Sequence, residues 1–379
     1  MSMFMRMALM PMAAMAGVGE DAAAQALRVY IGTYADGIYL MAFDPETGRL
    51  EARGRACETE APSFLALHPS APQLYSVGET GRPEGTVSAW RIDEATGGLE
   101  LLSVQSSRGT APCHIAVAPS EKHVAVANYG TGSITLLPIR ADGGLDAPCA
   151  VVQHEGTGPN AARQEGPHAH SVYFDPSGDR LLAADLGADK VFLYRYDADV
   201  GSLAPHAQPF ASAPPGAGPR HLAFHPSGAF LYALNELDST VTTYARDPES
   251  GRLDQRTVTP TLPEDFDGAS TTAEIRVHPS GRFLYASNRG HDSIAVFTIG
   301  ADGLPVPAGW TPTGGQTPRN FNLTPDGRHL LAANQDSDTV VVFRIDPETG
   351  VLAPTGDVAS APRPVCVLFA GAGEASDLR

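Results

Sequence analysis

Positive charge is scarce in this sequence, and its shortage excludes one class of partner. Lys and Arg total 26 against 43 Asp and Glu, which gives a formal net charge of −17 over 379 residues. No run of Lys or Arg offsets this charge. The chain would therefore repel a phosphate backbone, and we expect no nucleic-acid partner.

Cysteine is scarce as well, and the four residues are too widely spaced to cross-link a chain of this length. No two of them form a Cys-x-x-Cys pair, and we predict buried free thiols. A disulfide is the alternative if the protein is exported, and the sequence does not choose among the three pairings. The cysteines are Cys57, Cys113, Cys149 and Cys366.

Motifs that hold metals, nucleotides or catalytic serines are missing too. The sequence contains no His-Glu-x-x-His motif, no Cys/His cluster and no calcium loop. It also lacks a phosphate-cradling P-loop and a Gly-x-Ser-x-Gly elbow. We therefore predict no metal and no cofactor, and neither a serine-nucleophile hydrolase nor a nucleotide enzyme.

No stretch after the N-terminal segment is apolar over a length that could span a membrane. The segment itself has Arg6, a small and apolar run over residues 7–18, and Ala24-Gln25-Ala26, which matches a signal-peptidase pattern. We expect residues 1–26 to be a signal peptide or a disordered leader. Cleavage after Ala26 predicts a periplasmic or exported protein, and the alternative is a cytoplasmic one.

Glycine and proline are abundant, with 39 Gly and 32 Pro against 18% charged residues. This balance favours many short strands joined by tight turns over long helices. One pattern recurs: an alternating strand, a Pro-Ser-Gly type of turn, an apolar strand, and then Asn or Asp. Its copies start 44 to 57 residues apart, the range of four-stranded propeller blades. The copies begin at Pro62, Pro112, Ala169, Pro219, Thr272, Pro318 and Pro362.

The two ends of the chain complement each other. Residues 28–50 supply second, third and fourth strands without a first, whereas residues 362–369 supply a first strand with nothing after it. Six whole blades and one shared blade predict an all-β, seven-bladed β-propeller whose first and last strands share one blade. Sharing hides strand edges that would otherwise invite aggregation. We assign residues 27–370 to this domain and residues 371–379 to a flexible tail.

Aligning the blades predicts two neighbouring rings of side chains at one mouth of the channel. The first strand of each blade lines the channel, so one repeat position samples one ring around the axis. First and second strands form an antiparallel hairpin, and the start of one lies beside the end of the other. The first ring contains Ser63, Cys113, His170, Arg220, Ala273, Arg319 and Arg363. The second ring contains Glu79, Tyr129, Leu186, Glu236, Arg289 and Gln335.

Arginine exceeds carboxylate in these rings, and its planar fork suits a carboxylate or a phosphate. We therefore predict a small anionic ligand in one cavity. The alternative is that Arg and Glu merely pair across the channel. Arg276 and His168 are second-rank candidates near the rings. In contrast, His68, His225 and His278 recur in turns at the opposite end, and we expect them to be structural.

The motifs GPHAHSVYFDP, GPRHLAFHPSGAFLYALNEL, AEIRVHPSGRFLYASNR and PRNFNLTPDGRHLLAANQ resemble the propeller-type lactonase family, from about Arg28 to Phe369. The best-known activity of that family is 6-phosphogluconolactonase, and it includes a muconate-lactonizing branch. The resemblance implies catalytic roles for four ring residues. They are His170, Arg220, Glu236 and Arg289.

The resemblance further implies hydrolysis of a sugar δ-lactone to its aldonic acid. His170 or Glu236 would act as the general base or proton shuttle, and Arg220 and Arg289 would stabilise the tetrahedral oxyanion. A carboxylate among arginines has a depressed pKa, which favours His170 as the base.

The substrate is left open among several lactones. A phosphorylated sugar lactone fits the usual activity of the family, and an export leader favours an unphosphorylated or carboxylated lactone, opened or cycloisomerised in the periplasm. A non-catalytic binding propeller is the remaining alternative, because a fold does not fix a function. We expect a monomer. The expected substrate-binding residues are Arg319, Arg276, His168 and Arg363.

Overall fold

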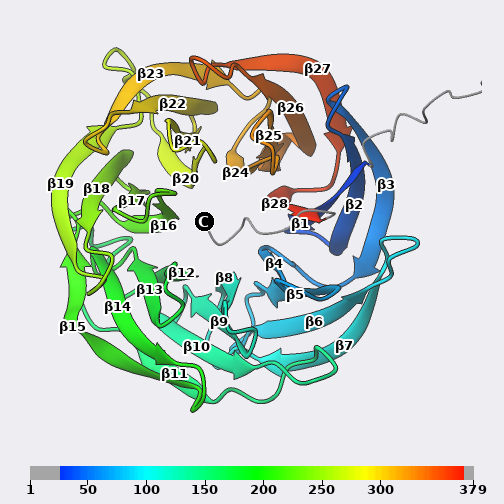
Figure 1. The fold of residues 1–379 in the computed structure, drawn as a ribbon, viewed down its shortest axis with the longest axis vertical. Coiled ribbons are helices and arrows are strands. Elements are labelled where there is room, and N and C mark those ends of the chain that lie inside the picture. Colours follow the sequence, from blue (N-terminus) through cyan, green and yellow to red (C-terminus); the bar gives the residue numbers. More distant parts are fainter. Residues whose placement is uncertain (1–25, 371–379) are drawn as a thin grey trace, which may run out of the picture.

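The computed structural model describes residues 26–370, and these form seven four-stranded antiparallel sheets around a central channel (Figure 1). The predicted seven-bladed β-propeller is therefore confirmed. The leader expected at residues 1–26 lies outside the described residues except for Ala26, and the tail at 371–379 lies outside them entirely. Within residues 26–370 no helix is long and apolar enough to cross a membrane.

Within each blade the four strands follow one another from the channel to the periphery (Figure 1). Blade 1 contains β28 (Pro364–Ala370), β1 (Leu27–Thr33), β2 (Gly37–Asp44) and β3 (Arg49–Glu58). Blade 2 contains β4 (Leu65–Leu67), β5 (Gln73–Gly78), β6 (Thr86–Ile92) and β7 (Leu99–Ser106). Blade 3 contains β8 (Pro112–Val117), β9 (His123–Asn128), β10 (Ser133–Pro138) and β11 (Ala150–Gln153). Blade 4 contains β12 (Ala169–Phe174), β13 (Arg180–Asp185), β14 (Lys190–Asp197) and β15 (Ser202–Ser212).

The remaining blades follow the same order. Blade 5 contains β16 (Pro219–Phe224), β17 (Phe230–Asn235), β18 (Thr240–Arg246) and β19 (Leu253–Pro260). Blade 6 contains β20 (Thr271–Val277), β21 (Phe283–Arg289), β22 (Ser293–Ile299) and β23 (Pro305–Pro312). Blade 7 contains β24 (Pro318–Leu323), β25 (His329–Asn334), β26 (Thr339–Ile345) and β27 (Leu352–Ser360). A single turn of 3₁₀ helix, η1 (Gln335–Ser337), follows β25.

Blade 1 closes the ring because β28, from the C-terminal end, pairs antiparallel with β1, from the N-terminal end (Figure 1). The register places Ile31 opposite Val367 and Val29 opposite Phe369. All four side chains are buried against blade 7 in one apolar cluster. The shared blade predicted from the two chain ends is therefore confirmed.

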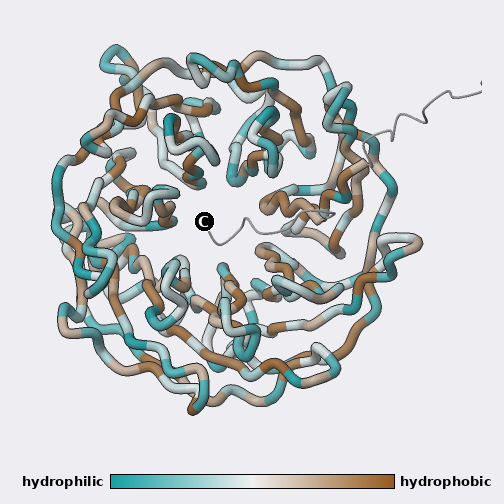
Figure 2. Tube along the Cα trace, in the orientation of Figure 1, coloured by the Kyte–Doolittle hydropathy of each residue, from teal (hydrophilic) through white to brown (hydrophobic). Residues whose placement is uncertain are grey.

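The core consists of apolar layers between neighbouring blades rather than one central core. Figure 2 shows hydrophobic segments along the strands of the blades and hydrophilic segments at many of the peripheral turns. Strands buried on both faces carry near-continuous apolar runs, such as VVVF in β26 and FLYA in β17. The outermost strands alternate, because only one face packs against the rest of the molecule.

A repeated hydrogen bond fastens one blade to the next. The tyrosine hydroxyl of a second strand donates to a glycine carbonyl in the turn between the third and fourth strands of the next blade. Each of these glycines has a positive φ, which a glycine adopts at no steric cost. The four pairs are Tyr30 with Gly97 (2.9 Å), Tyr75 with Gly143 (3.1 Å), Tyr232 with Gly303 (2.9 Å) and Tyr285 with Gly350 (2.9 Å).

Two of the His-Pro turns make similar links. Nε2 of His225 lies 3.0 Å from the carbonyl oxygen of Gly281, and Nε2 of His278 lies 2.9 Å from that of Gly327. Both glycines belong to the corresponding turn of the next blade. These contacts give His225 and His278 the structural role expected of them.

We predict that Tyr285→Phe lowers the free energy of unfolding by about 1 kcal/mol, because it leaves the buried Gly350 carbonyl without its donor. Chemical denaturation measures this change. Tyr39→Phe is the control, since the Tyr39 hydroxyl bonds Asp36 at the exposed surface and should change stability by less than about 0.5 kcal/mol. Equal effects of the two substitutions would contradict the fastening role.

Candidate active site

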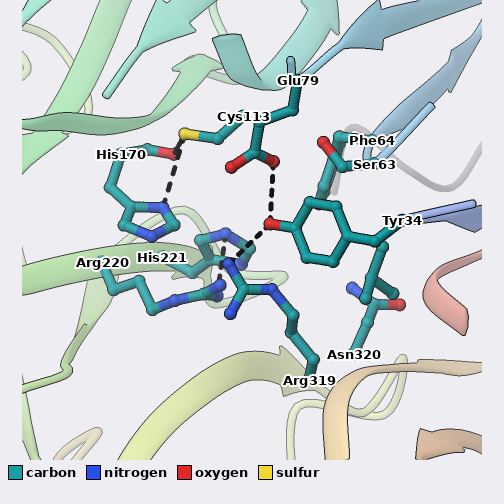
Figure 3. A pocket seen from close by; sticks show the side chains of 11 residues that line it. Tyr34, Ser63, Phe64, Glu79, Cys113, His170, Arg220, His221, Arg319 and Asn320 are labelled. Atoms are coloured by element: carbon teal, nitrogen blue, oxygen red, sulfur yellow. Dashed lines mark hydrogen bonds between the residues drawn. The ribbon is translucent and has the colours of Figure 1, made fainter. Parts of the chain in front are cut away.

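A polar pocket lies at the channel mouth where first strands begin and second strands end (Figure 3). The space between its side chains, including the part open to solvent, is about 250 Å³. Six of the seven blades contribute side chains to it. The lining residues are Tyr34, Ser63, Phe64, Glu79, Cys113, His170, Arg220, His221, Arg319, Asn320 and Val365.

The backbone brings the two rings together by one repeated hydrogen bond. In five blades the amide that follows the second strand donates to the carbonyl of the residue preceding the first strand. Glu236 N donates to Gly218 O at 2.8 Å, and Tyr129 N donates to Ala111 O at 3.0 Å. The end of one strand is thereby fixed beside the start of its partner, and the side chains of both rings face the same mouth.

The carboxylate of Glu236 is the centre of the charged cluster. Its Oε2 lies 3.0 Å from Nε of Arg220, 3.1 Å from Nη2 of Arg289 and 3.7 Å from Nε2 of His170. Its Oε1 accepts a hydrogen bond of 2.8 Å from Nη2 of Arg163. Side chains from three blades and one loop thus converge on a single buried carboxylate.

The pKa values of this cluster follow from burial and charge. Burial alone would raise the pKa of Glu236, but Arg289 and Arg220 hold it well below its usual range. Burial lowers the pKa of Arg289 to about 10, which still leaves it charged at neutral pH. Burial and the nearby Arg220 hold the pKa of His170 well below its usual value, so His170 is neutral there.

A second chain of hydrogen bonds forms the opposite wall of the pocket. Nη2 of Arg319 donates to the Tyr34 hydroxyl at 2.8 Å, and the hydroxyl donates to Oε2 of Glu79 at 2.8 Å (Figure 3). The guanidinium of Arg319 also lies over the Tyr34 ring, 5.1 Å from its centroid. Glu79 therefore contacts a tyrosine hydroxyl and feels the nearby charge of Arg319, whereas Glu236 contacts three arginines directly.

The structure brings together the four residues that the family resemblance marked, His170, Arg220, Glu236 and Arg289. Arg220 and His170 line the pocket, and Arg289 stands beside them on Glu236. Arg319, expected to bind substrate, lines the same pocket.

Two second-rank candidates lie away from the lining. Nε of Arg276 is 3.6 Å from the buried Glu274 carboxylate on β20, and Arg276 does not reach the pocket wall. The imidazole of His168 stacks on the Tyr129 ring at 4.5 Å, and its Nδ1 lies 2.9 Å from the Tyr129 carbonyl.

The expected ring position of Arg363 is wrong by two residues. β28 begins at Pro364, so Val365 takes the ring position and lines the pocket. Arg363 instead occupies the corner before the strand, with φ 43°, the position held by Ala111 (φ 51°) in blade 3. Arg363 has Pro on both sides, so the repeat pattern fits a start at either proline, and the strand begins at the second. Arg363 is exposed and lies over the Tyr34 ring at 5.4 Å.

Six residues of the site are not among those that the sequence predicts: Tyr34, Phe64, Arg163, His221, Asn320 and Val365. Tyr34 and Arg163 are the two that bond the glutamates. Tyr34 follows Thr33 at the end of β1, as Tyr129 follows Asn128 at the end of β9, so alignment of the shared blade could have found it. Arg163 had no such signal. It lies in the loop 154–168 between β11 and β12, where the spacing between repeats is longest.

The Arg163 loop is anchored by buried polar contacts. Nε2 of Gln164 donates to Leu186 O at 2.8 Å and to Oδ1 of Asp189 at 2.7 Å. Nδ1 of the fully buried His154 lies 2.7 Å from Oδ2 of Asp185. These anchors hold the loop in place so that Arg163 reaches Glu236.

All four cysteines are free thiols, as predicted, but only Cys113 and Cys366 are buried, whereas Cys57 is half-buried and Cys149 is exposed. Cys113 lies in the pocket with its Sγ 3.8 Å from Nδ1 of His170. Burial raises the pKa of the Cys113 thiol far above its usual value, so the thiol stays protonated. This environment argues against Cys113 as a nucleophile.

Comparison with known proteins finds a match over nearly the whole described chain. The family model described as lactonase, seven-bladed β-propeller, matches residues 28–369. The chain is 36% identical to a 6-phosphogluconolactonase of Bacillus subtilis, over 90% of this chain and 97% of that protein. It is 33% identical to a 6-phosphogluconolactonase of Formosa agariphila, over 77% of this chain and 85% of that protein. The structure of the periplasmic gluconolactonase of Pseudomonas aeruginosa is 32% identical, with a TM-score of 0.85 over 92% of this chain and 99% of that one.

We predict that Glu236→Gln lowers the free energy of unfolding by about 3 kcal/mol at pH 7, because it leaves buried arginines without their shared counter-charge. The pKa of Glu236 is lowered in the folded state, so its stabilising effect is present above the ordinary glutamate pKa and is lost as the pH falls towards the folded value. The difference between wild type and variant should therefore shrink below about pH 4. Urea denaturation at several pH values measures it.

Glu100→Gln is the matched control, since Glu100 forms an exposed ion pair with Arg91 at 3.2 Å. We expect a change below about 1 kcal/mol at every pH. A loss no larger for Glu236→Gln than for this control would show that the cluster is not held by the Glu236 charge.

Proposed function

This chain belongs to the seven-bladed β-propeller lactonase family, and we propose that it hydrolyses a sugar lactone to its aldonic acid, as a 6-phosphogluconolactonase does. The observation that carries this proposal is the charge of the pocket. The site contains the four arginines Arg163, Arg220, Arg289 and Arg319 against the two carboxylates Glu79 and Glu236. An excess of guanidinium groups in a protein of net charge −17 favours an anionic substrate and an anionic transition state.

Lactone opening adds water to the ring carbonyl and passes through a tetrahedral oxyanion. We assign the stabilisation of that oxyanion to Arg220, which lines the pocket. Arg289 adds its positive charge from its position on Glu236. Glu236 orients both guanidinium groups by accepting their hydrogen bonds. Because its pKa is held well below the usual range, Glu236 is suited to this role and is a weak base.

His170 contributes a neutral imidazole at the pocket wall. Its neutral form can both donate and accept a hydrogen bond, which suits it to orienting the lactone or the attacking water. Arg319 is assigned to the anionic group of the substrate, since it lines the pocket and carries a full charge. A phosphate on the sugar would extend towards the mouth, where Arg363 is exposed beside Tyr34.

We predict that the purified protein opens 6-phosphogluconolactone or gluconolactone faster than buffer does, and that His170→Ala lowers kcat/KM by at least about 100-fold. Acid release measured with a pH indicator, with the spontaneous rate subtracted, gives both values. His206→Ala on the outer strand β15 is the control and should retain wild-type kcat/KM. Failure to accelerate either lactone would contradict the lactonase proposal and favour a binding propeller.

We also propose export through residues 1–26, supported by Arg6, the apolar run at 7–18 and Ala24-Gln25-Ala26. N-terminal sequencing of the protein expressed in a bacterium tests it. A mature chain that begins at Leu27 is the expected result, because the cleavage pattern ends at Ala26. A chain that retains Met1 or Ser2 would contradict export, and Ala26→Arg is a matched variant that should block processing.

A further inference from the structure

When Glu79 is ionised, the hydrogen bond between Tyr34 and Glu79 runs from the hydroxyl to the carboxylate. The guanidinium of Arg319 can only donate, so the Tyr34 oxygen accepts from it at 2.8 Å. The single hydroxyl proton of Tyr34 then points to Oε2 of Glu79 at 2.8 Å. One oxygen of Glu79 thus accepts a hydrogen bond, and its other oxygen turns away from Tyr34 towards the side of the pocket where His170 lies (Figure 3).

Four side chains at the site are able to accept a proton, and they differ in basicity: Glu79, Glu236, His170 and His221. Nearby arginines hold the pKa of Glu236 well below its usual range, and burial holds the pKa values of His170 and His221 well below theirs. These three groups are weak bases for that reason. Burial raises the pKa of Glu79 instead, since Arg319, Tyr34 and Arg220 only partly counter it. When the environment drives the pKa values of two carboxylates in one site apart, the carboxylate with the raised pKa is suited to proton transfer.

We propose that Glu79 is the general base of the site, a role that rests on the lactonase function proposed above. The Glu79 carboxylate removes a proton from the attacking water as the water oxygen bonds to the lactone carbonyl carbon. The resulting oxyanion lies against Arg220. As the carbonyl re-forms, the bond to the ring oxygen breaks, and the proton passes from Glu79 to that oxygen. The product is an open hydroxy acid, which ionises in water, and Glu79 is again a carboxylate.

Tyr34 is a positioning residue in this scheme, because it acts through Glu79. Its hydroxyl fixes one carboxylate oxygen and favours the ionised form of Glu79. The titratable and charged groups that face Glu79 come from four elements. They are Tyr34 from the β1–β2 turn, Cys113 from β8, Arg220 from β16 and Arg319 from β24.

The test is the pH dependence of kcat/KM between pH 4 and 7, measured with the lactone that the wild type opens fastest. The active form of Glu79 is ionised, so wild-type activity should fall as the pH drops through an apparent pKa above the ordinary value of glutamate. Glu79→Gln should lower kcat/KM by about 100-fold or more and abolish this acid limb. Glu236→Gln should lower activity but keep the limb, because the pKa of Glu236 lies below the range.

The Tyr34→Phe variant distinguishes a positioning role of Tyr34 from a purely structural one. Loss of its hydroxyl destabilises the ionised form of Glu79, so the acid limb should move to higher pH while activity at pH 7 falls less than in Glu79→Gln. Glu79→Asp retains the carboxylate and should restore part of the activity together with an acid limb. Glu100→Gln, exposed on β7, should match the wild type throughout. Thermal unfolding shows whether each variant is folded. If Glu79→Gln does not fold, the position of the acid limb in Tyr34→Phe and Glu79→Asp decides the test.

The outcomes separate this proposal from the proposed function. A wild type that opens lactones while Glu79→Gln keeps its rate and its acid limb would overturn the base role and leave the lactonase function standing. A limb that stays unchanged in Tyr34→Phe and Glu79→Asp and disappears in His170→Ala would assign the base to His170 instead. A wild type that opens neither lactone would overturn both.

Discussion

The antiparallel pairing of β28 with β1 is the interaction on which the rest of the molecule depends. It joins the two ends of the chain within one sheet and turns a row of blades into a closed ring. Without it, the apolar faces of blades 1 and 7 would each lose a neighbour, including the cluster that contains Ile31, Val340 and Phe369. Closure also gives the inner strands a common axis, and the convergence of side chains at one mouth follows from that axis.

This convergence brings arginines close enough to repel one another, and the buried carboxylates offset that repulsion. Arginines from separate blades are brought within reach of one another in a region largely closed to water, where their repulsion is strong. Glu236 compensates by accepting contacts from Arg163, Arg220 and Arg289 at 2.8 to 3.1 Å. The pocket keeps a positive excess, and the donors are held in position before a substrate arrives. Such preorganisation is what stabilises an oxyanion at little reorganisation cost.

The two glutamates of the pocket have the same chemistry and different surroundings. Glu236 is surrounded by guanidinium groups and is fixed in its charged form, whereas Glu79 faces a tyrosine hydroxyl and is shifted by burial towards its neutral form. Division of labour between two carboxylates by environment is a recurrent way to perform acid and base chemistry near neutral pH. The propeller produces this difference, because each glutamate directly follows the second strand of a different blade and meets different neighbours.

The sequence by itself determined the number of blades, the shared blade and the convergence of His170, Arg220, Glu236 and Arg289, because a repeat is local and its periodicity fixes which positions face the channel. The same reasoning misplaced Arg363, where two prolines offered two starts for a truncated repeat. Arg163 carried no repeat signal, since only the packing of Gln164 and His154 directs its loop to the site. The contrast between Glu79 and Glu236 was decided by the tertiary structure alone. Both occupy one repeat position, and their basicity depends on burial and on charges that come from other blades.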